Sequence, residues 1–413
     1  MLSGVKRNSK PFWTYVKSKI STRETVSNLV KPDGNMTTSD KEKAEVLQDF
    51  FVSVFTQENV EFMPVPSAMV YDSTLENLEI TSSDVSELLR KLNPSKSPGP
   101  DKLHPRILHE MADVLSVPLA IIFQTSLERG ELPLDWRSAN VTPIFKKGNK
   151  SHSKNYRPVS LTCIVCKVLE TLIRKVFMEH FNRNALLSPH QHGFVVGKSC
   201  TTHLLEVIDE WTRVLDDGGT IDAIYMDFMK AFDTVPHQRL LTKLEAYGIQ
   251  GNVHAWIKAF LLGRRQRVYV NGQQSNWCEV SSGIPQGSVL GPCLFLAYIN
   301  DLPSTVQSHI KLFADDTKLY VRSDLPGSCQ QLQNDLSLLE SWAEKRQLLF
   351  HPDKCTVLKV GRVQSAFEYR MGKEDDPVLL NESQVGRDLG VLVDARFTFK
   401  DHISQAVLNQ IGC

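Results

Sequence analysis

The spacing of hydrophobic residues predicts helices along much of the chain. Residues 41–55 place apolar side chains at positions 44, 47, 51 and 54, behind a Ser-Asp cap. A second helix is predicted to begin at Thr81, with apolar residues at positions 85, 88, 89 and 92 on one face. Further stretches predicted to be helical are 105–129, 166–181, 201–215, 292–302, 326–346 and 401–412.

Short runs of β-favouring residues predict strands between these helices. Residues 140–145 and 156–161 flank a polar, basic turn, which is the pattern of two strands and a connection. The apolar run at 223–227 indicates a buried strand that ends in an aspartate. Residues 264–272 combine a β-favouring run with an Asn-Gly turn signal. Two further hairpins are predicted at 310–320 and 387–394.

Two adjacent carboxylates, Asp315 and Asp316, stand at the predicted tip of the hairpin at 310–320. Adjacent aspartates repel one another, so a purely structural turn gains little from the second one. A divalent cation removes that repulsion, and hard cations such as Mg²⁺ prefer carboxylate oxygens. Taken alone, an Asp-Asp turn is more often a solvated loop, so the metal-site hypothesis needs support from other parts of the chain.

Asp227 is the candidate for a third carboxylate, because a strand that ends in an aspartate presents a ligand on a rigid element. By itself, this residue is more often a helix cap. The glycine- and proline-rich loop at 282–292 then opens the predicted helix at 292–302. Its glycines permit close approach of a backbone or ligand, and a helix N-terminus favours phosphate. Without the acids on either side, we would interpret it as an ordinary loop.

Basic residues gather at two of the predicted hairpins. Lys146 and Arg157 belong to a Lys-rich turn that is either simply solvated or able to clamp a triphosphate. Arg157 is the best single candidate, because its guanidinium can contact phosphate through two hydrogen bonds. Arg264, Arg265 and Arg267 lie beside a β-favouring run. That pattern suits a nucleic-acid backbone and, equally, an exposed hairpin edge protected by charge.

Composition limits the class of protein. The 413 residues are 41% hydrophobic and 23% charged, with 47 basic and 47 acidic residues, so the formal net charge is zero. This predicts a globular chain of two to three units without a basic coat, although a local basic channel is compatible with it. Eight cysteines without a disulfide-type framework predict reduced thiols in an intracellular protein. Cys163 and Cys166 form a CxxC pair without a second pair, which predicts a core role.

The start of the chain lacks the apolar run of a signal peptide. Elsewhere, no apolar run approaches the ~20 residues that a membrane-spanning helix needs. We therefore predict that the protein is not secreted, does not span a membrane, and acts in the cytoplasm, the nucleus or both.

Three separated pieces of the chain, taken together, resemble the palm motifs of reverse transcriptases. They are the strand end and helix start at 227–233, the Pro-Gln-Gly loop at 283–288 and the Phe-Ala-Asp-Asp turn at 313–316. The Tyr-Arg-Pro-Val-Ser-Leu run at 156–161 resembles the fingers motif of the same family. Further matches are at 97–101, 191–194 and 353–355. The whole set most closely resembles LINE-type (non-LTR) retrotransposon polymerases of the jockey-like group.

The resemblance implies an α/β (α+β) fold, namely the right-hand polymerase fold with fingers and palm. It implies an N-terminal helical extension and linker at 1–75, a helical lead-in to the fingers at 76–129, a reverse transcriptase domain at 130–395 and the start of a truncated thumb at 396–413. The endonuclease domain that such elements often carry does not fit in the residues before position 75. Lys102 and His351 stand where the family usually has glycine and asparagine.

The same resemblance implies that Asp227, Asp315 and Asp316 are catalytic residues and ligands of two Mg²⁺ ions, with Mn²⁺ as a possible substitute. One ion would activate the primer 3′-hydroxyl, and the other would hold the triphosphate and stabilise the leaving pyrophosphate. The roles implied for the other site residues are triphosphate binding for Lys146 and Arg157, exclusion of a ribose 2′-hydroxyl for Phe232, contact with template and incoming nucleotide for Gln286 and Gly287, and protonation of pyrophosphate for Lys354. As an alternative, Lys354 is a solvated lysine at a strand end.

The function implied is that of an RNA-directed DNA polymerase, which takes an RNA template, a DNA primer or target DNA, and dNTP substrates. One alternative is a catalytically defective remnant that only binds nucleic acid, given the short C-terminal part. A second is a maturase similar to those of group II introns, although no maturase-like extension is visible. All three carboxylates are present, which favours the polymerase.

Overall fold

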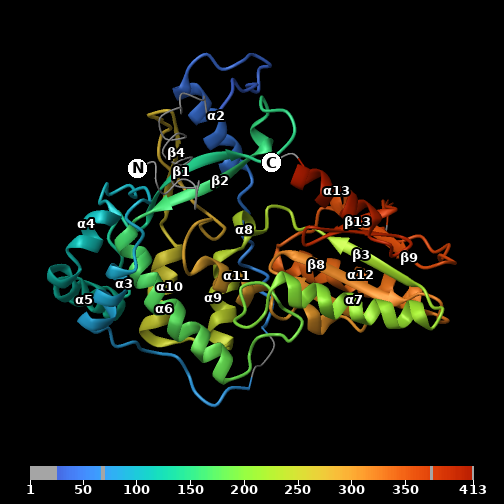
Figure 1. Ribbon diagram of the computed structural model, residues 1–413. Coiled ribbons are helices and arrows are strands. Elements are labelled where there is room, and N and C mark those ends of the chain that lie inside the picture. The colour runs from blue at the N-terminus through green and yellow to red at the C-terminus, as the bar shows by residue number, and fades with distance from the viewer. Residues whose placement is uncertain (1–25, 67–69, 373–374, 412–413) are drawn as a thin grey trace. The chain divides into compact units, whose positions relative to one another are not determined.

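The computed structural model describes residues 26–66, 70–372 and 375–411 (Figure 1). The first 25 residues of the predicted N-terminal extension therefore lie outside the described part. The chain separates into two compact units, each of which is described by itself. The first unit comprises Met1–Ser53, Asn140–Ser160 and Gln266–Cys278, and the second comprises Val54–Ala139, Leu161–Arg265 and Glu279–Cys413.

The first unit packs a helix against a sheet, as Figure 1 shows. Helix α2 (Asp40–Ser53) confirms the helix predicted at 41–55. The strands of the sheet, in spatial order, are β2 (Tyr156–Thr162), β1 (Ser138–Phe145), β4 (Arg265–Val270) and β5 (Gln273–Gln274), and β6 (Cys278–Glu279) also pairs with β4. The Asn271-Gly272 turn between β4 and β5 has positive φ at both residues, which is what the Asn-Gly signal predicts.

This unit has a small hydrophobic core of its own. Leu47 and Phe51 of α2 are buried with Val141, Tyr156 and Val268 from the three longer strands. The apolar stripe that predicted α2 is therefore the face that covers the sheet.

The second unit is built on a five-stranded sheet. Its strands, in spatial order, are β12 (Asn381–Glu382), β9 (Thr356–Val360), β3 (Ile221–Met226), β8 (Asp316–Arg322) and β7 (His309–Phe313). The central strand β3 is antiparallel to both of its neighbours. Residues from three distant parts of the sequence thus lie on adjacent strands.

The two faces of this sheet belong to different cores. Ile221 and Ala223 of β3 pack with Val207 and Trp211 of helix α7 (Cys200–Asp216). Ile224 and Met226 point to the opposite face and join the main core, together with apolar residues of α12 (Ser328–Arg346). Because side chains alternate along a strand, this assigns every residue of β3 and its neighbours to a face. Figure 1 shows α7 running along the sheet.

The other helices, short strands and 3₁₀ turns of the described chain are as follows. The helices are α3 (Ser82–Arg90), α4 (Pro105–Glu110), α5 (Ala112–Arg129), α6 (Ile164–Arg183), α8 (Ala231–Thr234), α9 (His237–Ala246), α10 (Gly251–Leu261), α11 (Gly291–Ile299) and α13 (Lys400–Ile411). The short strands are β10 (Arg370–Met371), β11 (Val378–Leu379), β13 (Val385–Asp388) and β14 (Val391–Asp394). Single 3₁₀ turns are η2 (Ser153–Asn155), which lies in the first unit, and η3 (Leu302–Thr305) and η4 (Pro352–Lys354).

Local signals account for several of these boundaries. Thr81 caps α3 through a capping box with Asp84, as predicted. The helical stretch predicted at 105–129 is two helices, because Met111 leaves the helical conformation with ψ 20°.

Cys163 and Cys166 are buried at the start of α6, which confirms their predicted core role. All cysteines in the described part of the chain are free thiols.

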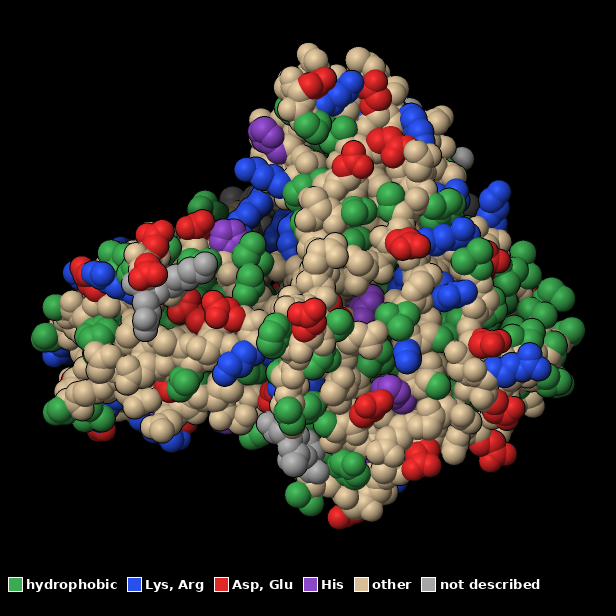
Figure 2. All heavy atoms as spheres, turned by 180° about the vertical axis from the view of Figure 1, so that it is seen from behind, with side chains coloured by type: hydrophobic (Ala, Val, Ile, Leu, Met, Phe, Trp, Pro, Cys, Tyr) green, Lys and Arg blue, Asp and Glu red, His purple; other side chains and the backbone are tan. Residues whose placement is uncertain are grey.

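Helix α5 is apolar on more than one face. Its inner face buries Leu119, Phe123 and Leu127 in the main core, whereas Val114 and Ile121 are more than 60% exposed. Figure 2 shows hydrophobic side chains gathered at the right edge of that view, where α4 and α5 lie.

Among the described residues, no helix is both long enough and apolar enough to cross a bilayer.

Candidate active site

The carboxylate pair lies at a tight turn, as predicted. Strands β7 and β8 pair up to Phe313 and Asp316, which leaves Ala314 and Asp315 as a two-residue turn. Ala314 has φ 54°, while Asp315 does not have a positive φ. A positive φ at the first central residue alone is the pattern of a type II′ turn, which matches the twist of the flanking strands.

The register of the sheet places a third carboxylate beside this turn. The last pair between β3 and β8 is Met226 with Thr317, so the same antiparallel register continues to Asp227 opposite Asp316. Asp227 is fixed on its other side by His351, whose backbone N–H donates to the Asp227 carbonyl at 2.8 Å. The two carboxylates therefore come from adjacent strand ends and from the same face of the sheet.

A cavity of about 340 Å³ opens on this face. Asp227, Asp316 and Lys354 all line it, so the structure brings these three predicted site residues together. Asp315 is half-buried at the turn and does not belong to the lining. The other residues that line the cavity are His203, Tyr225, Met226, Lys311, Phe313, Thr317, Lys318, Thr356, Arg387, Asp388, Leu389 and Gly390.

Lys354 contacts the strand-end carboxylate directly. Its Nζ donates to Oδ2 of Asp227 at 2.8 Å, with 55% and 41% of the two side chains exposed. An ion pair this exposed is screened by water and contributes at most about 1 kcal/mol to stability. The effect of this ion pair is therefore local: the Lys354 ammonium already neutralises part of the Asp227 charge in the absence of substrate.

The donor set fits a hard divalent cation. In the described part of the chain, no three or more His, Cys, Asp or Glu side chains gather closely enough to hold a metal ion by themselves. Mg²⁺, however, is usually held by one or two carboxylates together with waters and substrate phosphates. Asp227 and Asp316 supply such a pair on one face of the cavity.

The cavity also contains a buried ion pair that the sequence pattern did not predict. Lys318 of β8 donates to Asp388 of β13, and the two side chains are only 3% and 7% exposed. The ammonium also lies 5.5 Å from the ring centroid of Trp211 and 5.4 Å from that of Tyr225. Burial lowers the pKa of Lys318, while Asp388 raises it. The available signal was a lysine next to the apolar run Leu319-Tyr320-Val321 of β8.

The Pro-Gln-Gly loop packs on the segment that follows Asp227. Nε2 of Gln286 donates to Oδ1 of Asp233 at 2.8 Å, and the Ile284 N–H donates to the Phe232 carbonyl at 2.6 Å. Only glycine fits at position 283, since a Cβ there would lie 2.6 Å from the Asp233 carbonyl oxygen. The structure thus brings Phe232 and Gln286 together.

The two remaining residues of this cluster differ in exposure. The ring of Phe232 is half-buried and stacks on Phe295, with the centroids 4.7 Å apart. Gly287 is exposed and has φ 119°, a conformation that favours glycine.

Lys146 and Arg157 belong to the first unit and are both exposed. Lys146 directly follows β1, and Arg157 is the second residue of β2. The backbone N–H of Lys146 donates to the Asn155 carbonyl at 2.9 Å, so the two cations lie at the same end of neighbouring strands. Their role at the triphosphate stays a prediction.

His203 makes a testable contribution to acid stability. Burial, together with the nearby cations Lys318 and Lys311 and the ring of His192, lowers the pKa of His203 to about 3, against a smaller opposing effect of Glu206. In the unfolded chain the ring takes up a proton below about pH 6.5, whereas in the folded chain it stays neutral. The unfolded state therefore binds more protons between about pH 6.5 and pH 3, so the stability contributed by His203 is lost as the pH falls through this window.

We expect the wild type to lose about 1–2 kcal/mol more of its unfolding free energy between about pH 7 and pH 5 than a His203→Gln variant does. Urea unfolding at both pH values measures this difference. His152→Gln, at an exposed position, is the matched control and should follow the wild type. Equal pH dependence of the two variants would contradict the assignment.

Comparison with known proteins places these observations in a family. The family model described as reverse transcriptase (RNA-dependent DNA polymerase) matches residues 144–378. The RNA-directed DNA polymerase from mobile element jockey of Drosophila melanogaster is 27% identical over 399 residues, which cover 92% of this chain and 43% of that protein. The protein of the same name from Drosophila funebris is 27% identical, over 95% of this chain and 44% of its own length.

A third relative is the probable RNA-directed DNA polymerase from transposon BS of Drosophila melanogaster. It is 26% identical over 393 residues, which cover 90% of this chain and 43% of that protein. The chain therefore spans less than half the length of these relatives. The region matched by the family model is more than half of the 413 residues and contains the fingers motif and all three palm motifs. The chain belongs to the reverse transcriptase (RNA-dependent DNA polymerase) family.

Proposed function

We propose that this chain is the reverse transcriptase part of a non-LTR retrotransposon of the jockey-like group, and that it acts as an RNA-directed DNA polymerase. The observation that carries the proposal is the placement of Asp227 opposite Asp316 in one cavity, inside the region matched by the family model. The names of the relatives from mobile elements agree with it. An RNA template, a DNA primer or target DNA, and dNTPs are the proposed partners and substrates.

We assign the catalytic function to the three carboxylates. Asp227, Asp315 and Asp316 would hold Mg²⁺ or Mn²⁺, which in this chemistry lowers the pKa of the attacking 3′-hydroxyl and neutralises phosphate charge. Asp227 and Asp316 lie on rigid strand ends, so little reorganisation is needed before reaction. Asp315 occupies the turn itself, where the backbone conformation of Ala314 fixes its direction.

The neighbouring side chains have proposed roles in substrate binding. Lys354, which donates to Asp227, is positioned to give a proton to the leaving pyrophosphate. Phe232, held by its stacking on Phe295, would exclude a ribose 2′-hydroxyl. Gln286, anchored by Asp233, and Gly287 would contact the template and the incoming nucleotide. Lys146 and Arg157 would bind the triphosphate.

Primer extension tests the proposal. The purified chain is given poly(rA)/oligo(dT), dTTP and Mg²⁺, beside an Asp315→Asn variant of the same size and shape. We expect extension by the wild type and none by the variant, because the amide lacks the charge that a divalent cation requires. Asp135→Asn, the same change at an exposed position, is the matched control and should extend the primer like the wild type.

Two outcomes would contradict the proposal. Extension by Asp315→Asn at the wild-type rate would show that Asp315 is not a metal ligand. Absence of extension by the wild type, with the template and primer still bound, would identify the chain as a nucleic-acid-binding remnant. An intracellular location, expected from the cysteine pattern, remains part of this proposal.

A further inference from the structure

A short segment before α7 lies along the edge of the sheet beside the carboxylate turn. The N–H of His192 donates to the carbonyl of Leu312 at 2.8 Å, and the N–H of Leu312 donates to the carbonyl of His190 at 3.0 Å. Gln191 thus forms a parallel β-bridge with Leu312 of β7. This segment extends the sheet by a few residues next to the place where β7 enters the turn.

The side chain of Gln191 bonds to the turn itself. Its Oε1 accepts the N–H of Ala314 at 2.9 Å and the N–H of Gly193 at 2.7 Å. The side chain is buried, with 2% of the residue exposed. Its Nε2 is buried too and has no hydrogen-bond partner among the described residues. Only the acceptor half of the amide is therefore used.

The backbone of the turn needs such support. Ala314 has φ 54°, a left-handed conformation that strains a residue with a Cβ by about 1–2 kcal/mol. Gly193 approaches the turn so closely that a Cβ on it would lie 2.9 Å from the Phe313 carbonyl carbon and closer still to the Ala314 nitrogen. A strained backbone conformation persists only where surrounding contacts hold it in place. Here the hydrogen bond from Ala314 to Gln191 and the close packing of Gly193 both hold the turn.

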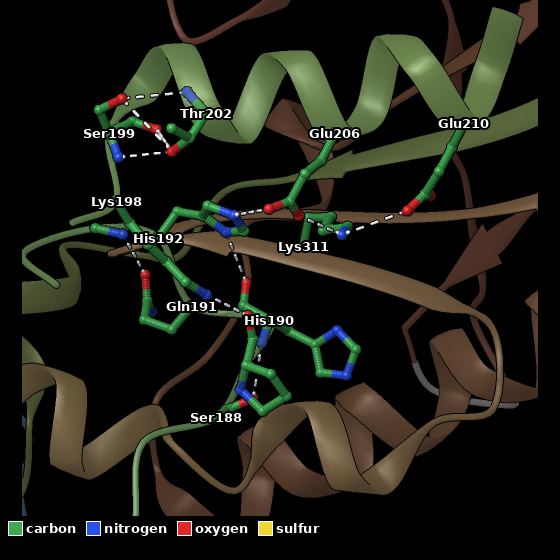
Figure 3. Close-up of polar contacts among 12 residues, drawn as sticks. Ser188, His190, Gln191, His192, Lys198, Ser199, Thr202, Glu206, Glu210 and Lys311 are labelled. Carbon is green, nitrogen blue, oxygen red and sulfur yellow. Dashed lines mark hydrogen bonds and ion pairs between the residues drawn. The ribbon is translucent and has the colours of Figure 1, made fainter. Parts of the chain in front are cut away.

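Figure 3 shows how this segment is anchored to the rest of the unit. The ring of His192 is fully buried, and its Nε2 lies 3.2 Å from Oε1 of Glu206 on α7. Glu206 also accepts from Nζ of Lys311 on β7 at 2.8 Å. The hydrogen bond from Lys311 is the main cause that lowers the pKa of Glu206 to about 2, so this carboxylate stays ionised. The segment, α7 and β7 are thereby held as one block.

We propose that Gln191 is a positioning residue for the catalytic turn. Its side-chain carbonyl holds the N–H of Ala314 and so fixes the direction in which Asp315 and Asp316 leave the turn. Gln191 begins the stretch at 191–194 that resembles a family motif, but neither that resemblance nor the family comparison assigns a role to its side chain. The catalytic consequence rests on the proposed function, whereas the hydrogen bond and its effect on the turn do not.

Two substitutions separate the acceptor from the rest of the side chain. Gln191→Met keeps the length and apolar volume but removes the acceptor. Gln191→Glu replaces only the unused Nε2 and keeps the oxygen that accepts both N–H groups. We expect Gln191→Met to lower kcat for dTTP incorporation about 100-fold, because misplacement of reacting groups by about 1 Å has effects of that size.

In the same assay, KM for dTTP and Kd for the template and primer should change by less than about threefold, since the Gln191 side chain is buried and presents almost no surface to a ligand. Gln191→Glu should restore kcat to within about tenfold of the wild type. A general loss of structure would not be reversed by the carboxylate, so this rescue distinguishes positioning from folding.

Amide hydrogen exchange tests the bond without reference to activity. We expect the Ala314 amide to exchange about tenfold faster in Gln191→Met than in the wild type, and at the wild-type rate in Gln191→Glu. Gln191→Asn, one methylene too short to reach, serves as a second variant with the same expectation if the Met variant does not fold.

Each result decides the inference. Unchanged Ala314 exchange in both the Met and Asn variants would overturn it, as would equally fast Ala314 exchange in the Met and Glu variants. An inactive wild type would overturn the proposed function instead, and the exchange rates would then still decide whether Gln191 holds the turn. Full support requires faster exchange and lower kcat in Gln191→Met, with both restored in Gln191→Glu.

Discussion

An Asp227→Asn variant is expected to incorporate dTTP about 1000-fold more slowly than the wild type. Asparagine preserves the size of the side chain at the end of β3 but removes the charge that faces Asp316 across the register. Without that charge, a divalent cation and the triphosphate have no strong counterpart at this strand end. Single-turnover primer extension at saturating Mg²⁺ measures the loss.

A matched change separates the carboxylate from its partner. Lys354→Gln removes the ammonium that donates to Asp227 while leaving the carboxylate in place. We expect this variant to keep more activity than Asp227→Asn and to reach half-maximal rate at an equal or lower Mg²⁺ concentration, because no cation competes for Oδ2. If Asp227→Asn folds and retains the wild-type rate, Asp227 is not a metal ligand.

A Phe232→Ala variant is expected to use ribonucleotides about 100-fold better, relative to deoxynucleotides, than the wild type does. The ring is half-buried and stacked on Phe295, and the Pro-Gln-Gly loop packs on its backbone, so its position is fixed. A fixed ring can exclude a 2′-hydroxyl by contact, whereas a methyl group leaves room for it. The ratio of kcat/KM for rUTP to that for dTTP measures the change.

Phe232→Tyr keeps the ring and is the control for this prediction. We expect it to discriminate against ribonucleotides as strongly as the wild type does. An unchanged ratio in Phe232→Ala would mean that the ring is only a core residue packed on Phe295, which is how an isolated half-buried phenylalanine would be interpreted.

Much of the local structure follows from the sequence, since it depends on residues close together in the chain. Helical spacing predicts α2, and the Thr81 cap predicts the start of α3. The β-favouring runs on both sides of Asp315 and Asp316 predict the hairpin that presents them. Family membership is also visible in the sequence, because the motifs are short and contiguous.

Other elements did not emerge from the pattern. Helices α9 and α10 lie in a region where the hydrophobic spacing predicted no helix, and their apolar residues enter the main core. Met111 divides the helical stretch at 105–129, although apolar residues occur in the helices on both sides of it. In such regions apolar residues occur on several faces, so spacing alone does not show where a helix begins or ends.

The arrangement of the site was decided by the tertiary structure. Asp227 lies opposite Asp316 because β3 pairs with β8 in one particular register, and Lys318 contacts Asp388 of β13. Gln191 reaches Ala314 because its segment pairs with β7. Registers between distant segments are selected by burial of whole faces, since a slip of one residue would turn every side chain to the other side. The sequence therefore predicted Asp227, Asp316 and Lys354 as candidate site residues, and packing of the sheet determined that they line one cavity together with residues the sequence did not predict.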